Sequence, residues 1–189
     1  MKMQRNFYNQ QQQTLKLFGS TVPRRDTALE IVEYQITSIE RELLQQEKSN
    51  PAGYRYMADN AWLHDLPTHQ LVDVMRDVFV SLPSPQSTVL YFNLAYERTM
   101  PEMALSMQTQ HYLGGYCIWK DSSRDDYCKR WLVDRFLHMH KVSPGVYIGD
   151  SDFQLRKAEF LAPGKREKLE QIRFKWDPKL RFCSYLGNE

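Results

Sequence analysis

The stretch of sequence that decides the fold, residues 144–182, reads PGVYIGDSDFQLRKAEFLAPGKREKLEQIRFKWDPKLRF. Residues 145–148 form a short apolar run with an aromatic and two β-branched side chains, which predicts a buried strand. The later part predicts a helix that ends near Trp176, because Pro178 disfavours a helical conformation at Asp177. We therefore expect a strand, a helix, a turn and an extended tail.

Length and composition place the chain among globular proteins. Its 189 residues are enough for one sizeable core, and 42% apolar with 13% aromatic residues argues against disorder. A formal net charge of +2 is too small to indicate nucleic acid or an anionic membrane as a partner. No apolar run approaches the roughly 20 residues that span a bilayer, so we expect no membrane span.

Cysteine and histidine usage indicates no disulfide framework and no metal site. Cys117, Cys128 and Cys183 are an odd number without a CxxC pair, as expected for reduced thiols of an intracellular protein. His138 and His140 are two residues apart and would diverge on a helix, which does not suit a shared metal ion.

The first 25 residues are expected to form a basic N-terminal arm. They contain Lys and Arg but no Asp or Glu, and they include a glutamine run at residues 10–13. Such a segment is typical of organelle targeting, and it is equally typical of an arm that lies on a partner.

Residues 26–50 are predicted to form an amphipathic helix. Asp26 is a suitable N-cap, and apolar residues then recur at spacings of three and four up to about Lys48. The stripe consists of Leu29, Val32, Ile36, Ile39 and Leu43. It could pack on a core or form a coiled-coil seam with a second protein chain, and both alternatives stay open.

Residues 51–189 are predicted to form one α+β domain. Thr68 begins a helix, residues 88–96 read as a strand, and Asp121 begins another helix. Residues 111–119 read as a second strand, where Gly114 and Gly115 indicate a bulge or a close backbone approach. Alternating helices and strands of this kind predict helices packed against one sheet.

Several motifs occur in the order of a known family. The C-terminal stretch contains GVYIG, followed by LEQIRFKWDPKLRF with Trp176 in a place usually held by tyrosine. Upstream lie residues 59–66, the PSP of residues 83–85, the strand at residues 112–119 followed by Asp121, and Trp131. Across residues 59–182 the chain resembles the C-terminal, substrate-binding half of the berberine-bridge-enzyme-like FAD-linked oxidases.

This resemblance implies an antiparallel sheet covered by helices and an FAD cofactor. The family's FAD-binding domain has no counterpart in these 189 residues, and the sequence has no glycine-rich phosphate loop. Residue 149 is glycine where the family has an asparagine beside the flavin ring, so a side-chain amide that can hydrogen-bond the ring is absent.

The resemblance also indicates the candidate site residues. Tyr147 is the candidate catalytic residue and, with Gly149, would lie by the flavin; a tyrosine whose pKa is tuned can act as a base. Tyr116, Trp119 and His111 are candidates for substrate binding. For each of them a purely structural role in the core is the alternative.

Three functions are consistent with this sequence. The first is the substrate-domain part of an FAD-linked oxidoreductase that acts on an alcohol or amine carbon with oxygen as acceptor, its flavin-binding domain being supplied elsewhere. The second is a non-catalytic interaction or structural subunit that binds a second protein chain through residues 26–48 or the C-terminal tail. The third is a cofactor-free cyclase or isomerase that binds a small molecule in the same cleft.

Overall fold

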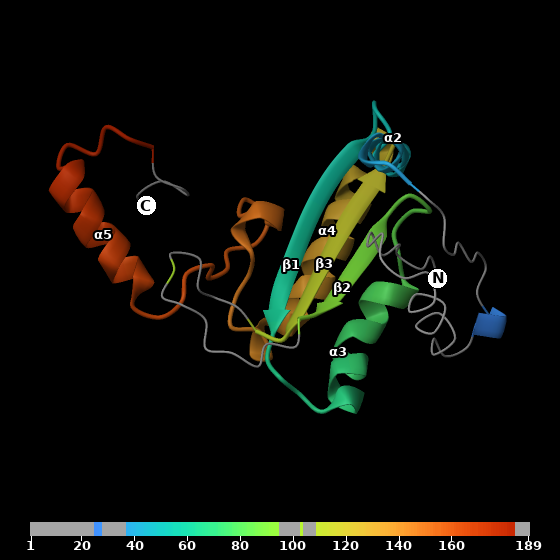
Figure 1. Cartoon of the computed structure of the whole chain (residues 1–189), viewed down its shortest axis with the longest axis horizontal. Coiled ribbons are helices and arrows are strands. Elements are labelled where there is room, and N and C mark those ends of the chain that lie inside the picture. Colours follow the sequence, from blue (N-terminus) through green and yellow to red (C-terminus); the bar gives the residue numbers. More distant parts are fainter. Residues whose placement is uncertain (1–24, 28–36, 95–102, 104–108, 184–189) are drawn as a thin grey trace. The chain divides into compact units, whose positions relative to one another are not determined.

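The structure is a computed structural model that describes residues 25–27, 37–94, 103 and 109–183 (Figure 1). The chain divides into two units between Ser49 and Asn50. All but the last residue of the predicted basic arm lie outside the described residues.

The described part of the first unit contains one α-helix, within the range that the sequence predicts to be helical. α2 (Ile39–Ser49) buries none of its side chains, and Arg25–Thr27 is a 3-10 turn. α2 begins at Ile39, where Ser38 caps it: the Ser38 hydroxyl accepts a hydrogen bond from the backbone N–H of Arg41 at 3.2 Å. Residues 28–36, with much of the predicted apolar stripe, lie outside the described part of the chain.

The second unit is built on an antiparallel sheet, as the resemblance implied. β1 (Arg55–Leu63), β2 (Thr88–Asn93) and β3 (His111–Trp119) lie in the order β1-β3-β2. α3 (Thr68–Val80) and α4 (Asp125–Leu137) contribute to the core, and α5 (Lys165–Trp176) follows near the C-terminus. The predicted α+β class with an antiparallel sheet and helices is therefore confirmed.

One face of the sheet forms the core with α3 and α4. Leu113 and Cys117 of β3 alternate with outward residues, as the two-residue period of a strand requires, and they belong to one core cluster with Leu132 and Phe136 of α4. Burial of these side chains is the main source of stability for a sheet of this size.

The glycine pair in β3 makes a close approach and no bulge. The pairing of β3 with both neighbours runs without interruption through Gly114 and Gly115. A Cβ atom at Gly115 would lie 2.7 Å from Cε2 of Phe136, so α4 can approach the sheet only because this position has no side chain.

The strand predicted at residues 145–148 is not formed. Gly145 makes a single bridge to Trp62, and a 3-10 turn follows at Ile148–Asp150. In contrast, α5 ends at Trp176 as predicted. The carboxylate of Asp177 then accepts hydrogen bonds from the backbone N–H groups of Arg181 and Phe182, which turns the chain.

No helix in the described part of the chain is long and apolar enough to cross a membrane. The three cysteines are free, with Cys117 and Cys128 buried and Cys183 exposed.

Candidate functional site

The face of β3 that points away from α4 carries two tyrosines separated by a glycine. Tyr112, Gly114 and Tyr116 share this face because side chains alternate along a strand. A Cβ atom at Gly114 would lie 3.2 Å from the Tyr116 ring and 3.3 Å from the Tyr112 ring. The missing side chain therefore allows the two rings to lean towards each other.

Both tyrosine hydroxyls donate to one carboxylate. The hydroxyl of Tyr112 lies 2.6 Å from Oδ2 of Asp150, and that of Tyr116 lies 2.8 Å from the same oxygen. Burial, reinforced by the hydrogen bond to Asp150, raises the pKa of Tyr112 and raises the pKa of Tyr116 to about 12. At neutral pH these phenols are hydrogen-bond donors to the carboxylate.

A row of aromatic side chains crosses the sheet beside this cluster. Trp62, Tyr112 and Phe92 are paired across β1, β3 and β2, with ring centroids 4.8 and 6.0 Å apart. The row forms part of a pocket of about 500 Å³, a volume that suits a small organic ligand. The described lining residues are Trp62, Phe92, Leu94, Met103, Tyr112, Val146, Tyr147, Ile148, Asp150 and Phe160.

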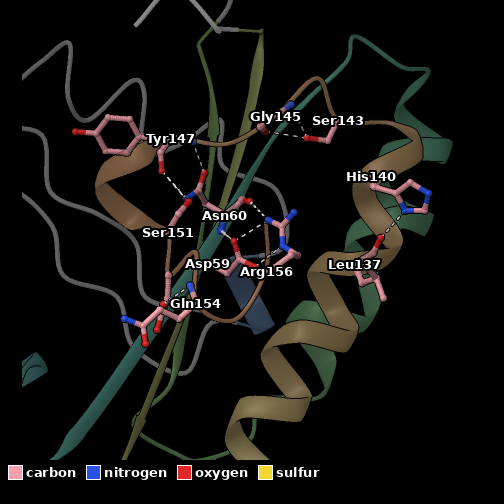
Figure 2. Close-up of polar contacts among 11 residues, drawn as sticks. Asp59, Asn60, Leu137, His140, Ser143, Gly145, Tyr147, Ser151, Gln154 and Arg156 are labelled. Atoms are coloured by element: carbon pink, nitrogen blue, oxygen red, sulfur yellow. Dashed lines mark hydrogen bonds and ion pairs between the residues drawn. The ribbon is translucent and has the colours of Figure 1, made fainter. Parts of the chain in front are cut away.

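An amide clamp holds the wall of the pocket against β1 (Figure 2). The fully buried Asn60 accepts a hydrogen bond from the backbone N–H of Tyr147 at 2.7 Å and donates to its carbonyl oxygen at 2.9 Å. The same amide nitrogen donates to the Ser151 hydroxyl at 2.8 Å. The turn that carries Asp150 is thereby fixed relative to the strand that carries Trp62.

A buried ion pair holds the same segment one step further along the chain. Arg156 contacts Asp59 through two nitrogen–oxygen pairs at 2.6 and 2.7 Å, and it also donates to the carbonyl oxygen of Asn60 at 2.9 Å (Figure 2). The side chains of Arg156 and Asp59 are only 11% and 7% exposed. Such a bidentate pair fixes both distance and orientation.

The ring of Tyr147 is exposed at the edge of the pocket. It is 42% exposed and is directed away from Asn60 (Figure 2). A Cβ atom at Gly149 would lie 2.6 Å from Cε1 of Tyr147, so the ring covers a position that only glycine leaves open. An asparagine at residue 149, as in the related family, would displace this ring.

The structure brings only some of the predicted site residues together. Tyr147 lines the pocket, and Tyr116 binds Asp150 in its wall. His111 and Trp119 lie at opposite ends of β3, roughly 25 Å apart at the usual rise per residue. Neither lines this pocket.

His111 and Trp119 are instead bonded within the fold. His111 is buried, and its Nδ1 lies 2.7 Å from the Tyr91 hydroxyl. The indole N–H of Trp119 donates to Asp125 at 2.7 Å. These contacts correspond to the structural alternative for both residues.

Three site residues were not predicted. Asp150, Tyr112 and Asn60 make the central contacts, although sequence analysis singled out none of them as a functional residue. The YLGGY pattern of residues 112–116 contains a usable signal, since it places two tyrosines on one face with a gap between them. Nothing in the local sequence predicts that Asn60 reaches Tyr147, 87 residues away.

Comparison with known proteins relates the sequence of this chain to FAD-linked oxidoreductases. The chain is 28% identical over 149 residues to the FAD-linked oxidoreductase janO of Penicillium janthinellum, and 30% identical over 154 residues to ptmO of Penicillium ochrochloron. These alignments cover 77% and 79% of the chain, but only 33% and 34% of the relatives. No family model matches the chain.

A solved structure shows the same fold. CrmK, a flavoenzyme involved in shunt product recycling in caerulomycin biosynthesis, superposes with a TM-score of 0.57 at 17% identity, over 72% of this chain and 32% of CrmK. The resemblance to FAD-linked oxidases is therefore confirmed: over most of its length this chain is related to about a third of an FAD-linked oxidoreductase.

Proposed function

We propose that this chain is the substrate-domain part of an FAD-linked oxidoreductase acting on an alcohol or amine carbon with oxygen as acceptor. The observation that carries the proposal is the aromatic pocket on the sheet, with Asp150 in its wall. The chain that forms this pocket aligns with about a third of the length of a related FAD-linked oxidoreductase. In this proposal Tyr147 is the catalytic residue at the pocket edge, and Tyr116 positions the wall through Asp150.

The described residues of the pocket suit the ring system of FAD and do not suit its pyrophosphate. The flat aromatic walls and a volume of about 500 Å³ suit a ring system. The lining carries a carboxylate and, among the described residues, no Lys or Arg for the pyrophosphate of FAD. We therefore propose that a domain or chain supplied elsewhere binds the phosphates of FAD.

The flavin would supply the redox chemistry, and this chain would supply orientation. The test begins with native mass spectrometry and a flavin spectrum of the protein isolated from its source. A complex that contains a second chain and FAD supports the proposal, whereas a flavin-free assembly contradicts it. We expect the chain purified alone to be colourless.

In such a complex, Tyr147→Phe should lower kcat by about a hundredfold or more if the phenol acts as a base, while the flavin stays bound. The matched control is Tyr127→Phe, at a half-exposed tyrosine on α4 outside the pocket. An unchanged kcat in Tyr147→Phe would remove this residue from the chemistry.

A second candidate function is an interaction subunit without redox activity. It is favoured by α2, where Ile39, Leu43 and Leu44 are 79%, 57% and 55% exposed. In this case the double substitution Ile39→Asp and Leu43→Asp should abolish assembly with a second chain and leave the unfolding transition of the second unit unchanged. Retained assembly would contradict this function.

A further inference from the structure

The pocket on the sheet combines apolar walls with one charged group. Trp62, Phe92, Val146 and Phe160 contribute aromatic and aliphatic surface. Apart from the tyrosines, Asp150 is the only ionisable residue among the described lining residues. An apolar ligand therefore meets a hydrogen-bond acceptor at one place in an otherwise non-polar site.

The carboxylate of Asp150 is held asymmetrically. Both tyrosine hydroxyls donate to Oδ2, at 2.6 and 2.8 Å, and within the described part of the chain no hydrogen bond is formed with Oδ1. Two donors on one oxygen hold Oδ2 in place and leave Oδ1 available as an acceptor. Oδ1 is thus a hydrogen-bond acceptor that no described residue uses.

Tyr112 and Tyr116 stay uncharged at neutral pH. Each phenol already uses its proton to bind Asp150, and burial raises the pKa values of both Tyr112 and Tyr116. Arg156, on the segment that follows Asp150, is paired with Asp59 through two contacts. Among the described lining residues, the charge of the pocket is therefore that of the aspartate.

We propose that this pocket binds an apolar, ring-containing small molecule through a protonated amine or hydroxyl group that donates to Oδ1 of Asp150. The inference rests on the proposed function, for which it names the substrate class: apolar amines and alcohols, with carboxylates and phosphates excluded. A buried charge–charge contact favours the ammonium group, and a like charge against Asp150 disfavours an anion.

The test uses three fluorescent probes that share one ring system: pyrenemethylamine, pyrenemethanol and pyrenecarboxylic acid. Their Kd values are measured on the purified full chain at pH 7 from the change in pyrene emission. We expect the amine to bind at least tenfold more tightly than the acid, with the alcohol between them. Equal affinities, or tighter binding of the acid, would overturn the proposal.

Two variants locate the effect. Asp150→Asn should remove the preference for the amine over the acid, a loss of tenfold or more in amine affinity. The matched control, Asp152→Asn, removes the same charge two residues away and should leave the preference intact, because Asp152 does not line the pocket and its role as an acceptor for the N–H of Gln154 can be kept by an amide. A preference that persists in Asp150→Asn would overturn the assignment to Asp150.

The outcome of this binding experiment does not depend on whether the proposed oxidoreductase function is correct. It needs no flavin, no second chain and no turnover, and the comparison of probes on the unaltered protein is decisive even if Asp150→Asn does not fold. A flavin-free assembly together with amine preference would reject the oxidoreductase and keep the ligand class. A flavin complex without amine preference would support the oxidoreductase and reject the ligand class.

Discussion

The side-chain amide of Asn60 bonds both the N–H and the carbonyl oxygen of the Tyr147 backbone, at 2.7 and 2.9 Å. This arrangement replaces the two backbone hydrogen bonds that a neighbouring strand residue would make. It explains why the apolar run at residues 145–148 is ordered without joining the sheet as a strand.

Asn60→Ala should lower the free energy of unfolding by about 3 kcal/mol, because it removes a fully buried side chain and leaves the backbone N–H of Tyr147 without its partner. Urea denaturation followed by tryptophan fluorescence measures this change. The exposed Gln86→Ala is the control and should be neutral within about 0.5 kcal/mol. A cost for Asn60→Ala no larger than that of the control would show that the clamp does not stabilise the fold.

Arg156→Met should cost about 3–5 kcal/mol, because the buried Asp59 carboxylate then lacks its counter-ion. Adding Asp59→Asn to Arg156→Met should restore part of this loss, which a double-mutant cycle by urea denaturation detects. Arg166→Met is the comparison: its ion pair with Glu159 is exposed, and about 1 kcal/mol or less is expected. Similar costs for the two arginines would contradict the assigned difference in burial.

The adjacent glycines of β3 should respond differently to alanine. Gly115→Ala places a methyl group 2.7 Å from the Phe136 ring and should reduce stability by about 1–3 kcal/mol through overpacking. The methyl group added by Gly114→Ala contacts only the rings of Tyr112 and Tyr116, so we expect nearly unchanged stability. Because these rings hold Asp150, we also expect severalfold weaker binding of pyrenemethylamine. Equal loss of stability in both variants would argue against the assignment of the two faces.

Tyr116 should ionise late and reduce stability at high pH. Its pKa in the folded state, about 12, lies above the usual value of 10 because of burial and the hydrogen bond to Asp150. Its contribution to stability is therefore complete below pH 10 and is lost as the pH rises towards 12. Absorbance at 295 nm should show a late titration step that Tyr116→Phe removes, and titration of every tyrosine near pH 10 would contradict this.

Local sequence patterns predicted the helices and strands whose apolar residues follow a regular period or whose end is set by a proline. The helix from Thr68, the strand at His111–Trp119 and the end of α5 at Trp176 follow from periodicity and proline chemistry. β1 was missed because Asp59 and Asn60 interrupt its apolar pattern. These two polar residues are buried since they bind residues 147–156, a partner that local periodicity does not reveal.

The candidate site was predictable only in part for the same reason. Tyr147 and Tyr116 came from the family resemblance, and the structure places both around Asp150 or its pocket. The choice of Asp150 as the common acceptor depends on the tilt of two rings over Gly114, a three-dimensional property. His111 and Trp119 have the right residue types but lie at the ends of β3 with other partners.

The sequence distances between the parts of the pocket have a consequence for folding order. Asn60 contacts Tyr147 across 87 residues, and Tyr112 contacts Asp150 across 38. Contacts of such long range require closure of large loops, so they form after the local helices and the pairing of β2 with β3. We therefore expect the pocket to form late in folding, so that ligand binding would report whether a molecule has reached its complete native state.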